Sequence, residues 1–200
     1  MYLFNYYTDY SIPNNLFDKL KLNLEQLWNL VKYYGPEKDN WSLLRKMDFI
    51  NYFGYHYPTE YEIDKIVKFV DNDKVISIGT GVSFIERLLL ENNIDIKASD
   101  SKENNDIWME TNKDYATTSI LNNKDHNAMM LCWPPYNTSM ALNALLSFKG
   151  DKVIYIGENY EGYVDIKFYN HLNENYKIEF IKGINWKNTD SSVHLATKIK

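Results

Sequence analysis

The sequence predicts an α/β protein with a doubly wound, mostly parallel sheet, preceded by a helical N-terminal arm. From Lys74 onward, short apolar runs alternate with helix-like stretches, which is typical of βαβ units. Near the C-terminus, two strand-like runs at 177–186 and 193–200 are joined by a polar stretch too short for a crossover helix. The last strand is therefore expected to run antiparallel. With 200 residues, 44% of them hydrophobic, the chain is long enough to bury one ordinary core.

The first seventy residues are expected to be mainly helical. Leucines recur at three- and four-residue steps between Asn15 and Tyr34, which predicts one amphipathic helix that ends at Gly35-Pro36. Further helical patterns cover 43–50 and the stretch that opens at Pro58-Thr59. We expect residues 1–53 to form the helical arm and residues 54–200 to form the α/β domain, packed together as one unit.

The remaining elements follow from short apolar runs and from the amphipathic stretches between them. Strands are expected at Val75–Ile78, Ile94–Ala98, Ala128–Trp133 and Val153–Ile156. Helices are expected at Phe84–Glu91, Ser139–Phe148 and Val164–Leu172.

Composition and charge exclude several classes of function. The net charge of −5 makes duplex DNA a disfavoured partner. No apolar run approaches the roughly 18 residues of a membrane span, and the N-terminus lacks the pattern of a secretory signal, so a cytoplasmic protein is expected. Cys132 is the single cysteine, which fits a reducing compartment, and the four histidines lack metal-ligand spacing.

A glycine turn indicates a nucleotide-like cofactor. Gly79-Thr80-Gly81 follows the strand at 75–78 and precedes a helix, so backbone N–H groups can approach a ligand closely. Asp100 ends the next strand, 19 residues after Gly81, where a carboxylate can accept hydrogen bonds from ribose hydroxyls. Phe84 stands where the dinucleotide pattern needs a third glycine, which favours a cofactor with adenosine but without phosphates.

A second loop, Trp133-Pro134-Pro135-Tyr136, ends the fourth predicted strand. The two prolines fix the backbone and leave carbonyl acceptors, while Tyr136 offers a flat face for a planar substrate. Glu158 follows the next strand and is a candidate to orient or deprotonate a nucleophile.

With these motifs, the stretch from Gly54 to Trp186 resembles the class I S-adenosylmethionine-dependent methyltransferases, and more closely a group of uncharacterised methyltransferase-like proteins. The resemblance implies a Rossmann-like sheet of seven strands and S-adenosyl-L-methionine as the cofactor. It also implies which residues contact the cofactor and which form the pocket for the methyl acceptor. Cofactor contacts are expected from Tyr57, Ser77, Gly79, Thr80, Gly81, Asp100 and Cys132, and an acceptor pocket is expected from Trp133, Pro134, Pro135, Tyr136 and Glu158.

The sequence also departs from this family at three positions. Many relatives have an acidic residue at the position of Ser77, a third loop glycine at Ser83, and Asn or Asp at Trp133. Trp133 has only an N–H donor, so it cannot accept a hydrogen bond from a target nitrogen. The leading hypothesis is methyl transfer to a small molecule, a protein or a single-stranded nucleic acid. The alternatives are a catalytically inactive methyltransferase-like binding protein and an NAD-linked oxidoreductase.

Overall fold

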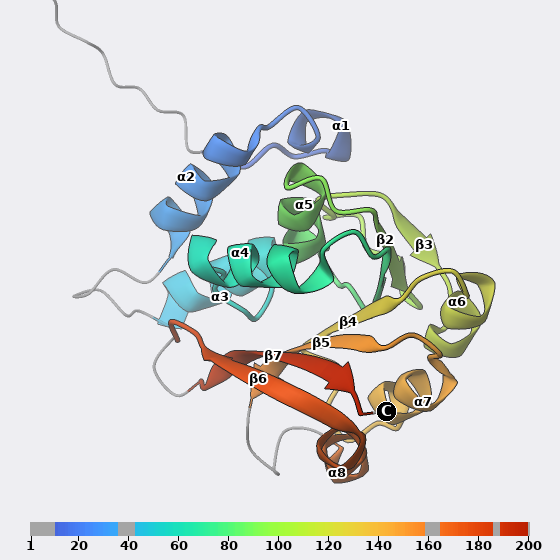
Figure 1. The fold of residues 1–200 in the computed structure, drawn as a ribbon. Helices are drawn as coiled ribbons and strands as arrows, with labels where there is room; N and C mark the ends of the chain where they lie inside the picture. Colours follow the sequence, from blue (N-terminus) through green and yellow to red (C-terminus); the bar gives the residue numbers. More distant parts are fainter. Residues whose placement is uncertain (1–10, 36–42, 159–164, 186–188, 200) are drawn as a thin grey trace, which may run out of the picture.

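The computed structural model describes residues 11–35, 43–158, 165–185 and 189–199. Within these ranges, one sheet contains the strands β1 (Val75–Ile78), β2 (Ile96–Asp100), β3 (Thr111–Lys113), β4 (Ala128–Cys132), β5 (Lys152–Glu158), β6 (Tyr176–Lys182) and β7 (Ser191–Lys198). Their order is β3-β2-β1-β4-β5-β7-β6 (Figure 1). Strands β1 to β5 are parallel, and β7 runs antiparallel to both β5 and β6. This arrangement confirms the predicted fold class.

Helices cover both faces of the sheet (Figure 1). One group comprises α1 (Leu16–Lys19), α2 (Leu24–Tyr34), α3 (Leu43–Phe53), α4 (Glu60–Val70) and α5 (Phe84–Glu91), and the other comprises α6 (Ala116–Asn122), α7 (Met140–Ser147) and α8 (Ile166–Asn175). Successive strand side chains point to opposite faces, so Val75 packs with α2 to α5 while Ile76 packs with α6 to α8. The sheet thus separates two hydrophobic cores. None of the helices in the described ranges combines the length and apolar character that a bilayer span requires.

The predicted helix from Asn15 to Tyr34 is wrong as one element, because the structure divides it into α1 and α2. The Asn23 side chain caps α2 by accepting a hydrogen bond from the Gln26 N–H, and the Gln26 side chain accepts one from the Asn23 N–H. Gly35 follows α2 as predicted, whereas Pro36 lies outside the described residues. Four residues of α2 are buried in the core of the sheet face that α4 and α5 also cover: Leu27, Trp28, Leu30 and Val31.

The region after β1 differs from the prediction in three details. β2 begins at Ile96 rather than Ile94, because the Ile94 N–H bonds back to the Leu89 carbonyl and so belongs to the turn after α5. The sequence patterns above did not locate β3 or α6. β3 has three polar residues at the edge of the sheet, and α6 has only seven residues, so neither has a strong apolar pattern.

Replacing Asn23 with alanine is expected to lower the free energy of unfolding by about 1 kcal/mol, because the capping box of α2 is lost. Chemical denaturation measures this change. Asn29→Ala is the matched control, since Asn29 is exposed within the same helix and alanine is a better helix former there. Equal unfolding free energies for the two variants would contradict a stabilising role for the cap.

Candidate functional site

The loop that follows β1 is shaped by two glycines with left-handed backbone angles. Gly79 has φ +70° and Gly81 has φ +56°, which residues with a side chain rarely adopt. The Gly79 N–H donates to the Ser99 carbonyl at 2.7 Å, and the Gly81 N–H donates to Asp100 Oδ2 at 2.9 Å. Asp100 Oδ1 accepts from the Lys102 N–H at 2.9 Å. The glycine loop and the acid at the end of β2 therefore form one hydrogen-bonded unit.

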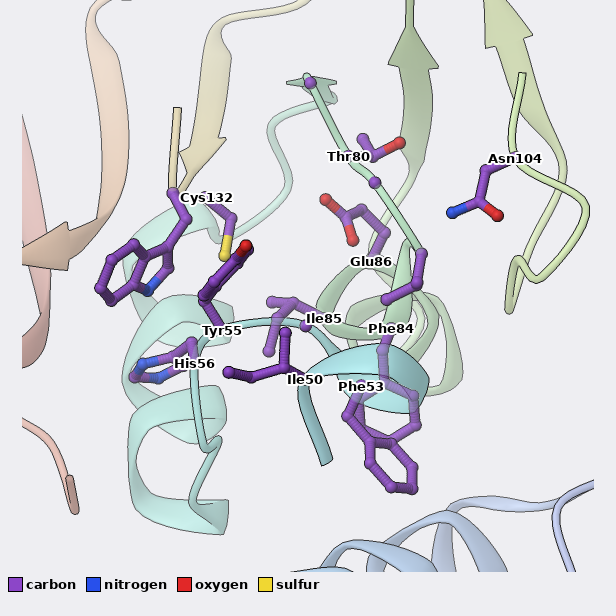
Figure 2. Close-up of a pocket in the computed structure, with 15 residues that line it drawn as sticks. Ile50, Phe53, Tyr55, His56, Thr80, Phe84, Ile85, Glu86, Asn104 and Cys132 are labelled. Carbon is purple, nitrogen blue, oxygen red and sulfur yellow. The ribbon is translucent and has the colours of Figure 1, made fainter. Parts of the chain in front are cut away.

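A cavity of about 180 Å³ lies beside this loop, at the carboxyl ends of β1 and β4, where ligands bind in open α/β sheets (Figure 2). Aromatic rings, the glycine loop, Glu86, Asn104 and Cys132 form much of its wall. A second hollow, of about 230 Å³, shares Gly81 and Asn104 with it and continues along β3. The described residues that line the 180 Å³ cavity are Ile50, Phe53, Gly54, Tyr55, His56, Gly79, Thr80, Gly81, Val82, Phe84, Ile85, Glu86, Asn104, Cys132 and Trp133.

Glu86 contributes a buried carboxylate to the cavity wall. It lies in the first turn of α5, is 2% exposed, and accepts a hydrogen bond from the Ser77 hydroxyl at 2.6 Å. Figure 2 shows this carboxylate between Thr80 and Cys132. The lining residues named above include no lysine or arginine, so the described wall carries no permanent positive charge.

Trp133 is held in place by a chain of polar contacts. Its backbone is left-handed, with φ +49°, and its indole N–H donates to Ser191 Oγ at 3.1 Å. The same hydroxyl lies 2.8 Å from His56 Nδ1, and His56 Nε2 lies 3.4 Å from Glu62 Oε1. Burial raises the pKa of Glu62, but the contact with His56 and hydrogen bonds from Thr59 outweigh it and lower that pKa. Glu62 therefore stays ionised beside His56.

The exposed Tyr55 ring stacks on Trp133, with ring centroids 5.3 Å apart and an interplanar angle of 28°. These two rings form an aromatic platform at the edge of the cavity.

The structure brings together most of the predicted cofactor residues. Gly79, Thr80, Gly81 and Cys132 line the cavity, Asp100 bonds to the loop, and Ser77 bonds to Glu86. Burial raises the pKa of the Cys132 thiol well above its usual value, so this thiol stays protonated and is not a nucleophile.

Tyr57 lies apart from the cavity lining. It packs against Phe49 with ring centroids 5.5 Å apart, and burial raises its pKa.

The predicted acceptor residues are spread more widely. Trp133 lines the cavity, but Pro134, Pro135 and Tyr136 do not. Tyr136 is 61% exposed and lines a separate hollow next to α7 and α8. Glu158 is buried at the end of β5, where its Oε1 accepts from the Asp190 N–H at 3.4 Å.

Glu86 is the functional candidate that sequence reasoning missed. The pattern Ser83-x-x-Glu86 before an apolar run looks like a helix capping box. In the structure the Ser83 side chain makes no capping hydrogen bond, and Glu86 reaches Ser77 instead. Across the described ranges, no group of three or more His, Cys, Asp or Glu side chains is placed to hold a metal ion.

Solved methyltransferases share the overall structure. Magnesium protoporphyrin IX methyltransferase from Synechocystis PCC 6803, solved with bound S-adenosylmethionine, matches with a TM-score of 0.56 and 11% identity, over 94% of this chain and 99% of that chain. An rRNA methylase from Streptococcus thermophilus matches with a TM-score of 0.50 and 12% identity, over 70% of this chain and 95% of that chain.

A third match is 1,6-didemethyltoxoflavin-N1-methyltransferase from Burkholderia thailandensis, with a TM-score of 0.52 and 9% identity, over 70% of this chain and 78% of that chain. In sequence, no protein-family model and no curated protein matches. The strand order, the antiparallel β7 and these superpositions together show that the chain has the fold of the class I S-adenosylmethionine-dependent methyltransferases.

Proposed function

We propose that this protein is a methyltransferase that uses S-adenosylmethionine and binds it in the cavity beside Gly79–Gly81. The observation that carries the proposal is the character of the cavity wall. It combines a buried carboxylate with several aromatic rings and, among the described lining residues, has no lysine or arginine. Aromatic faces and carboxylates both attract cations, so the wall suits a ligand with a sulfonium and an ammonium group.

The loop residues also fit the adenosyl part of this cofactor. Each oxygen of Asp100 accepts one backbone hydrogen bond, which leaves a further lone pair on each for the two ribose hydroxyls. Thr80 Oγ1 is buried without a hydrogen-bond partner and lines the cavity, so a polar ligand atom can satisfy it.

When bound, the cofactor supplies an electrophilic methyl group, which a lone pair of the acceptor takes from sulfur while the sulfur keeps the electrons of the broken bond. The chain then needs mainly to hold the two reactants in line and to exclude water. We place the acceptor beside the Tyr55–Trp133 platform, at the open side of the cavity. The acceptor is a small molecule, a protein or a single-stranded nucleic acid.

Binding without turnover is the second candidate function, and one observation favours it. The Trp133 side chain has only an N–H donor, which is bonded to Ser191, so it can neither accept a hydrogen bond from a target nitrogen nor donate a free one to the substrate. The third hypothesis, an NAD-linked oxidoreductase, is disfavoured because the buried Glu86 carboxylate would repel a pyrophosphate beside the loop.

Calorimetric titration with S-adenosylmethionine and S-adenosylhomocysteine tests the cofactor site. Micromolar binding, about −8 kcal/mol, is expected for the unmodified chain. Asp100→Ala is expected to weaken it about 100-fold, or about 3 kcal/mol, because two hydrogen bonds to a charged group are lost. Asp95→Ala removes the same charge from an exposed position at the opposite end of β2 and should leave affinity unchanged. Unchanged affinity in the Asp100 variant would refute the assignment of the site.

Formation of S-adenosylhomocysteine in the presence of fractionated cell extract tests turnover. Appearance of this product supports the methyltransferase. Tight cofactor binding with no product from any fraction supports the non-catalytic candidate instead. Binding of NADH without binding of either sulfur ligand would revive the oxidoreductase.

A further inference from the structure

The carboxylate of Glu86 has an unusual position for an acidic side chain. It extends from the first turn of α5 toward Ser77 of β1, is almost fully buried, and lines the cavity. The Ser77 hydroxyl donates to its Oε1 at 2.6 Å, which fixes the orientation of the carboxylate. Among the described residues, no lysine, arginine or histidine forms an ion pair with it.

The surroundings of Glu86 destabilise its ionised form. Burial raises the pKa of Glu86 to about 7, the negative charge of Asp100 acts in the same direction, and the hydrogen bond from Ser77 opposes both. The other titratable side chains that line the same cavity are Tyr55, His56 and Cys132, and the described lining includes no lysine or arginine. A ligand that brings a positive charge would therefore stabilise the ionised form.

Thr80 adds a second requirement that a ligand in this cavity must meet. Its hydroxyl oxygen is buried, has no hydrogen-bond partner among the described residues, and belongs to the same wall as Glu86 (Figure 2). A ligand group that satisfies both side chains must carry positive charge and donate several hydrogen bonds. An ammonium group does both, whereas a sulfonium cannot donate a hydrogen bond.

We infer that Glu86, together with Thr80, binds the α-ammonium group of the cofactor, and that cofactor affinity consequently depends on the ionisation of Glu86. This inference rests on the proposed function, because it takes the ligand to be S-adenosylmethionine or its product. The adenosyl part has no ammonium group, and the cofactor's own carboxylate would be repelled by Glu86.

The direction of the pH dependence follows from the raised pKa. Below pH 7 the free protein holds a proton on Glu86, so the ammonium loses its charged partner and binding must release that proton. Affinity for S-adenosylhomocysteine should therefore fall about tenfold between pH 7.5 and pH 6. An analogue in which hydrogen replaces the amino group should bind equally well at both values.

The test is calorimetric titration of the full chain and of Glu86→Gln with S-adenosylhomocysteine and this deaminated analogue, at pH 6 and pH 7.5. Glu86→Gln is expected to weaken the binding of S-adenosylhomocysteine at least tenfold at pH 7.5 and to abolish its pH dependence. The affinity for the deaminated analogue is expected to stay the same. Titrations in buffers of different ionisation enthalpy should show proton release on binding at pH 6 for the unmodified chain. Glu91→Gln, at the other end of α5, is the matched control and should behave like the unmodified chain.

The possible failures are distinguishable. If the unmodified chain binds the analogue and S-adenosylhomocysteine with equal affinity and no pH dependence, the role of Glu86 is overturned while the adenosyl site stands. If pH dependence persists in Glu86→Gln, another group such as His56 carries it, and the inference is also overturned. If the unmodified chain binds neither ligand, the proposed function fails and this inference fails with it. The comparison of the two ligands needs no variant, so it holds even if Glu86→Gln does not fold.

Discussion

Replacing Gly81 with arginine is expected to abolish measurable binding of S-adenosylmethionine, weakening it by more than about 1,000-fold, or about 4 kcal/mol. Gly81 lies where the two hollows beside the glycine loop meet, and it lines both of them. A Cβ atom added there has no heavy atom within 4 Å, so the new side chain can extend into this open space. Arginine would both fill the space and place a positive charge where a cationic ligand should bind.

Gly81→Ala is the control that separates this effect from backbone strain. Both variants force a side chain onto a residue with φ +56°, at a cost of about 1–2 kcal/mol in stability. Only arginine occupies the space beside the loop. The alanine variant should therefore bind the cofactor within several-fold of the unmodified chain, and equally weak binding by both variants would show that loop strain, not occupation of the cavity, controls affinity.

Most of the fold could be predicted because its signals are local. Short runs such as Val75–Ile78 end in turn residues, and the polar segment before β7 is too short for a crossover, which predicts the antiparallel hairpin. The break between α1 and α2 was missed because the leucine spacing continues through it. The Asn23-x-x-Gln26 capping pattern was the available signal.

The candidate site was predictable only where its residues follow strand ends. Gly79, Gly81 and Asp100 were found because chain order alone brings the ends of neighbouring parallel strands together. Glu86 was not, because its contact with Ser77 depends on how α5 packs against the sheet. The sequence shows directly that position 77 is serine rather than an acidic residue. It does not show that the Glu86 carboxylate of α5 reaches Ser77 from a different element.

Replacing Trp108 with alanine is expected to lower the free energy of unfolding by about 4 kcal/mol, the usual cost of deleting a large buried aromatic ring. Trp108 is fully buried and stacks on Phe53 at 5.6 Å between ring centroids, while Phe84 meets it edge-on at 4.9 Å. Lys19 Nζ lies 4.9 Å from the centre of the ring. The ring therefore joins α1, α3 and α5, and urea denaturation should show the loss as a lower midpoint.

Trp108→Phe separates packing from hydrogen bonding. Phenylalanine keeps an aromatic ring in the cluster but removes the indole N–H that donates to the Tyr52 carbonyl at 2.6 Å, which should cost about 1–2 kcal/mol. Equal losses in the two variants would mean that the hydrogen bond, not the aromatic packing, stabilises this region. A loss below about 1 kcal/mol in Trp108→Ala would contradict both contributions. The backbone N–H of Trp108, which both variants keep, donates to the Val82 carbonyl beside the glycine loop. Cofactor affinity measured in the alanine variant would therefore show whether the aromatic ring, in addition to this backbone hydrogen bond, helps to position the loop.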